Sequence, residues 1–390
     1  MGGAEQERRE AVMRVLSGEP PSKVASDLGR TDRWVRKWVA RYDPADATWA
    51  EERSRAPKTQ AHRTEQETEE LVLKIRQRLQ GDNPWAQVGA VAIAWEMEKL
   101  KVTPPTTRTI ERILSRAGVP KRRARNRDRY VPKGTPYPGG PLVIKPNAVH
   151  EIDLVGPRHL QGALPFYALN AVDLGRRRAG VEIIQSKEEW QVAEGLVSLW
   201  RRLGVPGRAK FDNGQTFQGR GRHLALPVWT CLALGVKVRF IPFAEPWRNP
   251  VVEHFNDTFD KQFFRTERFS GLAHLKRRAR AFERFHNSHH RYSILKGATP
   301  DEIEPTLRFV ARLPDDDFEL PTALPRRGLV EFVRLIRSDR TLKVLGSKFQ
   351  TPQALVHRYV TATLHVRTQR LVIESRDHPW REELSFPLKL

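Results

Sequence analysis

The chain contains a single cysteine, Cys231, among its 390 residues. One cysteine cannot form an internal disulfide, and without any CxxC pair the usual tetrahedral zinc site is excluded. No apolar run approaches the roughly 18 residues that a membrane helix needs, and residues 1–30 contain no apolar signal core. We therefore expect a protein of a reducing cytoplasm with no membrane partner.

The sequence also lacks the GxxxxGK[ST] pattern of a P-loop, so any ATP dependence would have to come from a separate partner protein. What it has in excess is positive charge, with 68 Lys and Arg against 46 Asp and Glu, a formal net charge of +22. Such an excess attracts polyanions, which makes nucleic acid the expected partner. A merely cationic soluble surface is the alternative, but the basic residues arrive in local runs such as 121–129.

The N-terminal residues 1–43 predict a helix-turn-helix domain of three short helices. Thr31 is placed to cap the third helix, on which Trp34, Val35 and Trp38 face inward. A tight turn followed by a basic helix is typical of DNA-reading modules, although a plain three-helix bundle with solvated arginines is the competing interpretation. The DNA-binding candidates here are Arg33, Arg36, Lys37 and Arg41.

Two linkers and a second helical unit are predicted next. Residues 44–63 are polar and aperiodic, so we predict a linker, and residues 64–118 predict a second helical DNA-binding domain with a helix that begins at Pro84 and Trp85. Residues 119–146 form a basic, Pro- and Gly-rich linker that can lie along phosphates or serve only as a spacer. The DNA-binding candidates of these segments are Arg108, Arg112, Arg116, Lys121, Arg122, Arg123 and Arg125.

The middle of the chain, residues 147–305, alternates β-rich runs with amphipathic helices, which predicts an α/β sheet covered by helices. Three acids in this region, Asp153, Asp212 and Glu253, each lie where a strand ends or a helix begins. Asn249 and Pro250 supply an N-cap and a first residue for the helix that carries Glu253. Three carboxylates in such positions indicate a site for divalent metal.

The motifs around these acids, NAVHEIDLVG, FDNGQTF and NPVVEHFN, resemble in content and order the DDE transposase and retroviral integrase superfamily. The closest resemblance is to the integrase-like transposases of bacterial insertion sequences, which implies a bacterial protein associated with the nucleoid. The interval between Asp212 and Glu253 is slightly longer than is usual in retroviral integrases, and an insertion at 219–227 accounts for it, either as a DNA-contacting loop or as a longer connection. Thr299 and Pro300 also match the segment that closes the core in this family.

The resemblance implies a ribonuclease H-like catalytic core and two Mg²⁺ or Mn²⁺ ions, with Asp153 bridging both ions, Asp212 binding one and Glu253 the other. It implies cleavage and strand transfer of double-stranded DNA, between element ends and target DNA, by a homo-oligomer that an accessory ATPase or target-selection partner could assist. Further candidates for DNA contacts, near the acids, are Asn213, Arg248 and Asn249. Alternatives are a catalytically idle DNA-binding regulator and a general nuclease.

The C-terminal part follows a predicted linker at 306–325. Residues 326–390 contain short alternating runs typical of strands, which predict a small SH3-like β-barrel. The whole chain is thus expected to be a multidomain α+β protein with N-terminal helix-turn-helix domains. Whether the barrel binds DNA or a neighbouring subunit is left open by the sequence, as are the element-end sequence, the target preference and the number of copies in a complex.

Overall fold

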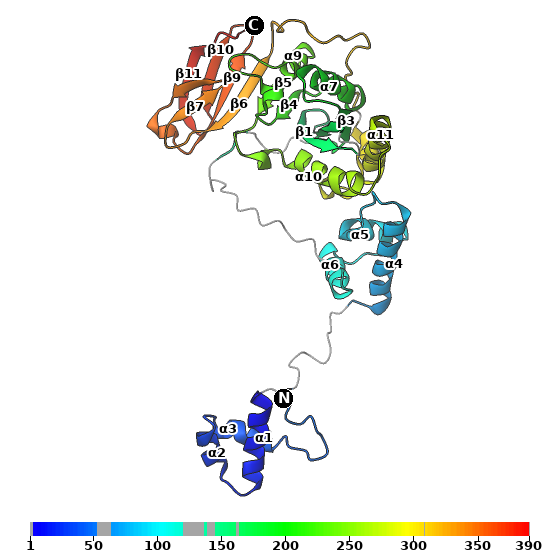
Figure 1. The fold of residues 1–390 in the computed structure, drawn as a ribbon, viewed down its shortest axis with the longest axis vertical. Helices are drawn as coiled ribbons and strands as arrows, with labels where there is room; N and C mark the ends of the chain where they lie inside the picture. Colours follow the sequence, from blue (N-terminus) through cyan, green and yellow to red (C-terminus); the bar gives the residue numbers. More distant parts are fainter. Residues whose placement is uncertain are drawn as a thin grey trace. The chain divides into compact units, whose positions relative to one another are not determined.

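The computed structural model describes residues 3–52, 64–119, 136–138, 145–160, 164–307 and 309–389 (Figure 1). The chain divides into two compact units, Met1–Glu65 and Gln66–Leu390. Most of the basic linker lies outside the described residues, including the candidates Lys121, Arg122, Arg123 and Arg125. None of the helices in the described ranges is long and apolar enough to cross a membrane.

The first unit contains the three predicted helices, α1 (Gly3–Leu16), α2 (Pro21–Asp27) and α3 (Asp32–Val39). The side chain of Thr31 accepts a hydrogen bond from the Trp34 amide, which makes it the N-cap of α3 as predicted. Val35 is fully buried and Trp38 is nearly so. The basic residues of α3 therefore lie on its outer face.

Residues 44–52, placed by the sequence in a linker, pack against these helices instead. Trp49 and Ala50 are buried in one cluster with Val12 and Trp38. Arg9 donates a hydrogen bond to the Ala47 carbonyl at 2.7 Å. The linker was predicted because residues 44–63 are polar and show no hydrophobic periodicity. A single Trp in a polar stretch adds no periodicity, so this packing was not predictable from the pattern.

The second unit begins with α4 (Gln66–Asp82), α5 (Ala90–Lys99) and α6 (Thr107–Arg116), which enclose an apolar core of their own. The helix expected from Trp85 starts only at Ala90. The residues before it are not helical, and the Trp85 indole meets the rings of Phe263, Phe282 and Phe285 at 5.6–6.0 Å between centroids. The contact with distant phenylalanines overrides the local helical pattern.

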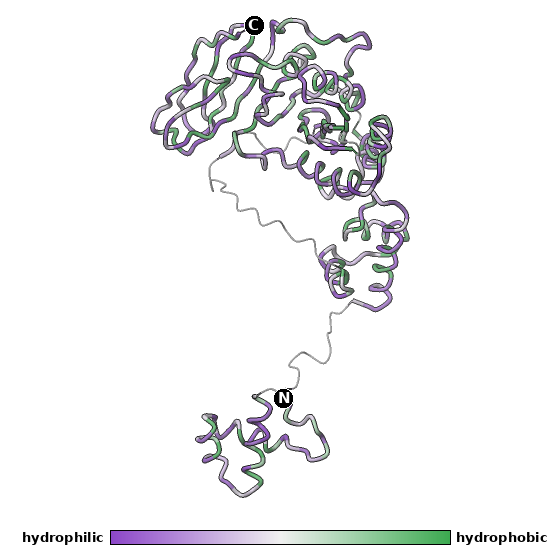
Figure 2. Tube along the Cα trace, in the orientation of Figure 1, coloured by the Kyte–Doolittle hydropathy of each residue, from purple (hydrophilic) through white to green (hydrophobic). Residues whose placement is uncertain are grey.

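The central sheet contains the strands β1 (Val149–His159), β2 (Pro165–Asp173), β3 (Ala179–Ile184), β4 (Arg208–Phe211) and β5 (Lys237–Phe240). Strands β1 to β3 are antiparallel neighbours, whereas β4 and β5 run parallel to β1. The mixed α/β core predicted for this region is confirmed. Figure 2 shows hydrophobic residues along these strands and along the helices that cover them.

Helices cover both faces of this sheet. The helices α7 (Glu189–Leu203) and α9 (Leu226–Ala233) share one apolar cluster with Ile152 of β1, and the short helix α8 (Gln215–Gln218) adds Phe217 to it. The opposite face is covered by α10 (Pro250–Thr258) and α11 (Leu272–His289). Between these two helices α10 continues as a π-helix, η2 (Phe259–Phe264). Short helical turns elsewhere are η1 (Pro246–Arg248), η3 (Ser293–Leu295), α12 (Pro300–Ile303), η4 (Glu304–Leu307) and η5 (Gln353–Leu355).

The C-terminal strands are β6 (Leu329–Leu335), β7 (Thr341–Val344), β8 (Ser347–Gln350), β9 (Tyr359–His365), β10 (Arg370–Ser375) and β11 (His378–Ser385). Strand β6 pairs parallel with β5, and the described residues thus form one sheet in the order β11-β10-β9-β6-β5-β4-β1-β2-β3. Strands β7 and β8 pair only with each other.

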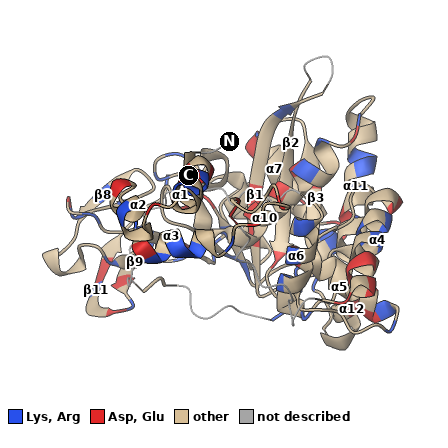
Figure 3. Ribbon diagram, turned by 90° about the horizontal axis from the view of Figure 1, so that it is seen from below, with Lys and Arg blue, Asp and Glu red and all other residues tan. Residues whose placement is uncertain are grey.

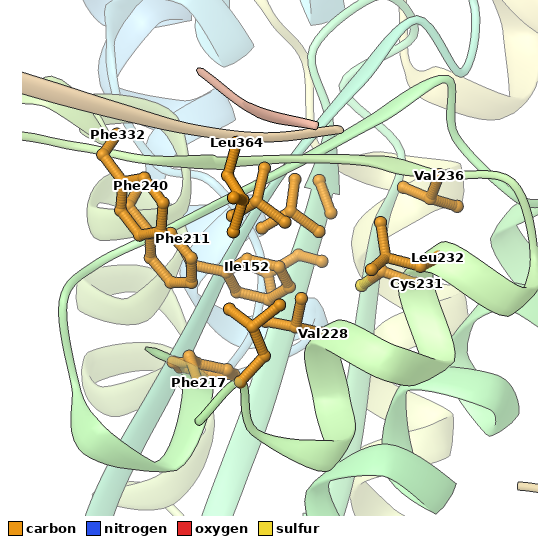
Figure 4. Close-up of a cluster of buried hydrophobic side chains, with 14 of the residues drawn as sticks. Ile152, Phe211, Phe217, Val228, Cys231, Leu232, Val236, Phe240, Phe332 and Leu364 are labelled. Atoms are coloured by element: carbon orange, nitrogen blue, oxygen red, sulfur yellow. The ribbon is translucent and has the colours of Figure 1, made fainter. Parts of the chain in front are cut away.

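This arrangement differs from the separate SH3-like barrel expected for residues 326–390, since the described strands close no barrel. The reason is the inward face of β6, where Val330 and Phe332 are fully buried in the same cluster as Phe211 and Phe240 (Figure 4). Those side chains continue the central core, and the edge of β5 supplies the hydrogen-bonding partner that β6 requires.

Candidate active site

Asp153 and Asp212 come from neighbouring parallel strands. Glu151 of β1 pairs in register with Lys210 of β4. Two residues further on, each chain carries one of the acids, and a step of two returns a side chain to the same face of a sheet. Asp212 follows the last residue of β4 and accepts a hydrogen bond from the Gly214 amide at 3.0 Å. The two acids therefore lie at one level of the sheet, where β4 ends.

The helix that carries Glu253 is seated by Glu151. This carboxylate is 1% exposed and accepts hydrogen bonds from the amides of Val251 at 2.8 Å and Val252 at 3.1 Å. It also accepts one from the Lys210 ammonium at 2.9 Å. A negative charge at a helix N-terminus meets both the free amides and the helix dipole. Strand β1 thereby fixes where α10 begins.

The predicted cap of α10 is confirmed in position but not in its hydrogen bond. Pro250 is the first helical residue and Asn249 precedes it, yet the Asn249 side chain makes no capping hydrogen bond. Its Oδ1 atom is buried without a hydrogen-bond partner among the described residues. Glu151 replaces the cap that local sequence indicated.

A second connection joins α10 to Asp153 itself. Asn256 donates from Nδ2 to Oδ2 of Asp153 at 2.6 Å, and Asn170 of β2 donates to Oδ1 of Asn256 at 2.8 Å. Asn170 lies directly opposite Asp153 in the β1–β2 register. Because Asn256 is three residues after Glu253, it lies on a neighbouring part of the helix surface. Sequence reasoning missed both asparagines, although Asn170 is conspicuous as a polar residue in an apolar strand.

The negative charges of Asp212 and Glu253 act on Asp153. Burial, together with these two charges, raises the pKa of Asp153 to about 6, although hydrogen bonds from the Leu154 amide and from Asn256 oppose the rise. Burial also raises the pKa of Asp212, against the effect of the Gly214 amide. The fold thus gathers like charges at one place, which is unfavourable unless a cation or a proton compensates them. Figure 3 shows acidic residues, in red, around β1 and α10.

The side chains of the three acids offer only oxygen atoms as metal ligands. Among the residues that the structure describes, no three His, Cys, Asp or Glu side chains form a ready-made metal-binding group. Three carboxylates with mutual repulsion nevertheless fit Mg²⁺ or Mn²⁺, because these ions prefer oxygen ligands and supply the missing positive charge. Asp153, Asp212 and Glu253 are therefore the residues of this site that suit such an ion.

Other acids nearby are engaged in structural contacts. Asp173 is fully buried and accepts from Nε of Arg176 at 2.7 Å. Glu245 accepts from the Tyr359 hydroxyl at 2.9 Å, and Asp257 from Lys261 at 2.7 Å. Each of these three carboxylates thus accepts a hydrogen bond from a side chain outside the group of Asp153, Asp212 and Glu253.

Two of the residues predicted to contact DNA near the acids make intramolecular contacts here. Asn213 donates to the Ile241 carbonyl at 2.6 Å and accepts from Arg334 at 2.9 Å. Arg248 donates to Glu245 at 3.0 Å and to the Tyr359 hydroxyl at 2.8 Å. Their roles toward DNA stay predictions, but these contacts give both side chains a structural role.

The insertion at 219–227 reaches the C-terminal strands. Arg222 donates to the Ser347 hydroxyl of β8 at 3.1 Å, and its guanidinium lies 4.8 Å from the centre of the Phe386 ring. The Lys389 amide donates to the Arg222 carbonyl at 3.1 Å. Of the two readings left open by the sequence, these contacts favour a connection inside the protein.

The predicted DNA-binding residues of the helical units are mostly on exposed surfaces. On α3 Arg33, Arg36 and Lys37 are exposed, whereas Arg41 is half-buried, with its guanidinium 4.8 Å from the centre of the Trp38 ring. On α6 Arg108, Arg112 and Arg116 are exposed, and Arg116 forms a 2.5 Å ion pair with Glu69. Figure 3 shows Lys and Arg, in blue, along each of these helices.

Comparison with known proteins identifies the first of these units. Residues 3–46 match the family model of a homeodomain-like domain of helix-turn-helix type, so the predicted N-terminal helix-turn-helix domain is confirmed. No curated protein sequence matches the chain.

Among solved structures, the HTLV-2 integrase catalytic core domain in complex with magnesium, in its dimeric form, is 16% identical, with a TM-score of 0.32. The match covers 41% of this chain and 97% of that one. An intasome of simian T-cell lymphotropic virus in complex with the PP2A regulatory subunit B56 gamma is 14% identical over 77% of this chain and 93% of that one, with a TM-score of 0.38. At these TM-scores the likenesses carry no conclusion about the function of this chain.

Proposed function

We propose that this protein is a DDE-type transposase or integrase, which binds the ends of a mobile DNA element and performs metal-dependent strand cleavage and strand transfer. The observation that supports this most is the electrostatic coupling of Asp153 to Asp212 and Glu253, three acids from separate motifs that converge at one edge of the sheet. The proposal places the protein on DNA in the bacterial cytoplasm.

In the proposed site Asp153, Asp212 and Glu253 hold the divalent ions. When bound, Mg²⁺ or Mn²⁺ activates the attacking water or 3′-hydroxyl and stabilises the leaving oxygen of the phosphodiester. The protein's contribution is placement: Asn256 fixes one oxygen of Asp153, and Glu151 fixes the start of the helix that carries Glu253. Ligands held by hydrogen bonds from neighbouring groups bind metal better than free side chains do.

DNA binding is assigned to the helical units. The homeodomain-like domain and the exposed arginines of α3 are suited to a DNA groove and its phosphates, and α6 presents a second basic ridge. We propose residues 1–43 and 64–118 as DNA-binding domains and 147–305 as a ribonuclease H-like catalytic core. The family resemblance implies a multimer that bridges two DNA ends, so a homo-oligomer on DNA belongs to the proposal.

The test is a strand-transfer assay with the purified protein, Mg²⁺ or Mn²⁺, and DNA that carries the inverted repeats flanking its gene. The wild type is expected to nick or join these ends, and Asp212→Asn to bind them without reaction. Asp257→Asn is a matched control, since Asp257 lies on the same helix as Glu253 but pairs with Lys261. End binding without any strand transfer would instead identify a regulator, and cleavage without end preference a general nuclease.

A further inference from the structure

The C-terminal strand β6 reaches the turn that carries Asp212. Across β4, β5 and β6 the residues Phe211, Phe240 and Phe332 are aligned in register. The rings of Phe240 and Phe332 are stacked at 5.3 Å with an interplanar angle of 12° (Figure 4). Arg334 lies two residues beyond Phe332 on β6, on the same face of the strand as that ring, and Asn213 is the second residue after the end of β4.

Arg334 is 3% exposed and makes four hydrogen bonds, one of them to a residue of this turn. It donates to Oδ1 of Asn213 at 2.9 Å, to the Ile241 carbonyl at 3.2 Å, to the Val333 carbonyl at 2.8 Å and to the Lys343 carbonyl at 3.0 Å. All four acceptors are neutral. Burial lowers the pKa of Arg334 to about 9, so the guanidinium is still charged at neutral pH.

A buried cation whose hydrogen bonds go only to neutral oxygens is costly to fold, because desolvation is not offset by a directly bonded opposite charge. This unfavourable free energy would be offset if the Arg334 guanidinium stabilises a backbone conformation that neighbouring residues in the sequence do not stabilise. Asn213 completes this arrangement, since its Nδ2 donates to the same Ile241 carbonyl at 2.6 Å. Arg334 and Asn213 thus close a ring of hydrogen bonds behind the residue that follows β4.

We propose that Arg334 is a positioning residue of the active site, which acts through Asn213 to hold the turn that presents Asp212. The C-terminal strands are then part of the catalytic centre rather than an appended module. This inference rests on the proposed function, because it concerns the placement of a metal ligand.

The experiment measures Mn²⁺ affinity of the full-length protein by titration calorimetry without DNA, alongside the melting temperature. Arg334→Met keeps an unbranched apolar stem and removes the hydrogen bonds of the guanidinium, and Asn213→Ala removes the other partner. Each is expected to weaken Mn²⁺ binding about tenfold, a typical effect of losing a group that orients a metal ligand. The double variant should bind Mn²⁺ no more weakly than either single variant does, because both changes break the same contact.

Val333→Ala is the matched control, since Val333 is buried on the same strand and its carbonyl remains in place. It should lower the melting temperature and leave Mn²⁺ affinity unchanged. Arg334→Lys should recover part of the affinity, because an ammonium reaches fewer of the acceptors than a guanidinium does. If Arg334→Met fails to fold, Asn213→Ala alone decides, with the same tenfold loss expected.

Wild-type affinity in Arg334→Met or Asn213→Ala overturns the inference, as do additive losses in the double variant. If these variants bind Mn²⁺ normally while the wild type transfers strands, only the inference fails. A wild type that neither binds Mn²⁺ nor processes its element ends overturns the proposed function itself.

Discussion

Two carboxylates only two residues apart on β1, Glu151 and Asp153, lie in opposite kinds of surroundings. Around Glu151 every contact is complementary, with a lysine and two helix amides as donors. Around Asp153 two further carboxylates raise its pKa. The first environment stabilises the fold, and the second stores an unfavourable interaction that a bound cation relieves. The same residue chemistry thus supports stability or reactivity according to its neighbours.

The largest effect on the rate of strand transfer is expected from removing a negative charge at Asp153 or at its neighbour Asp212. Asp153→Asn and Asp212→Asn should each lower the rate of strand transfer at least about a thousandfold, since a neutral amide is a poor ligand for the ions that carry the chemistry. Rates on element-end DNA at saturating Mg²⁺ measure this. Asp257→Asn should stay within a few-fold of the wild type, and activity retained in Asp212→Asn would contradict the assignment of the site.

Removing Glu151 should chiefly reduce stability. Glu151→Ala leaves the Lys210 charge and two amides of α10 without this partner, and loss of one member of a buried ion pair costs about 3–5 kcal/mol. The expected result is a lower melting temperature, measured by tryptophan fluorescence. Glu253→Gln, on the same helix but among the acids, should not show it. If Glu151→Ala and Glu253→Gln lowered the melting temperature equally, Glu151 would have no special role in stabilising the fold.

The Asn256 contact tests whether the two environments are linked. Asn256→Ala removes the hydrogen bond to Asp153, and we expect strand transfer to fall about tenfold, as for other groups that orient metal ligands. Asn256→Asp replaces the donor by another negative charge, so its loss should be larger. Strand-transfer rates of both variants, compared at one Mg²⁺ concentration, check the order. A rate for Asn256→Ala equal to that of the wild type would show that Asp153 needs no such support.

The smallest effect has the opposite sign. The folded protein raises the pKa of Asp153 from 3.8 to about 6, so this group favours folding below pH 4 and the contribution is lost as pH rises through 6. Asp212→Asn removes one of the charges responsible and should therefore stabilise the metal-free protein at pH 8 by about 1 kcal/mol, allowing for partial solvent exposure. Melting curves in EDTA should show this gain at pH 8 and none near pH 4.

Local sequence patterns predicted the acids and the elements that carry them. Asp212 is recognisable because a short strand ends at the turn FDNG, and the Asn249–Pro250 pair marks the start of the helix with Glu253. Both signals are contained in a few consecutive residues. The N-terminal helix-turn-helix was predictable for the same reason, since Thr31 and the buried Trp38 define α3 locally.

Features that depend on distant partners were not predictable. Strand β6 has the alternating pattern of a barrel strand, and only the free edge of β5 decides that it joins the central sheet. The local pattern predicts that a helix starts at Trp85, and only the contact with distant phenylalanines shows why it does not. Likewise nothing near Asn256 indicates that its amide reaches Asp153.

The position of β6 in the sheet has a consequence during synthesis of the protein. Strand β5 has left the ribosome well before β6 does, yet β6 is its neighbour in the finished sheet. A nascent chain that already contains Asp153, Asp212 and Glu253 still lacks Arg334 and the strand that covers the edge of β5. If Arg334 holds the turn with Asp212, as proposed, such a chain carries all three acids but lacks the contact that fixes Asp212, so the complete site would form only when the last strands have been made.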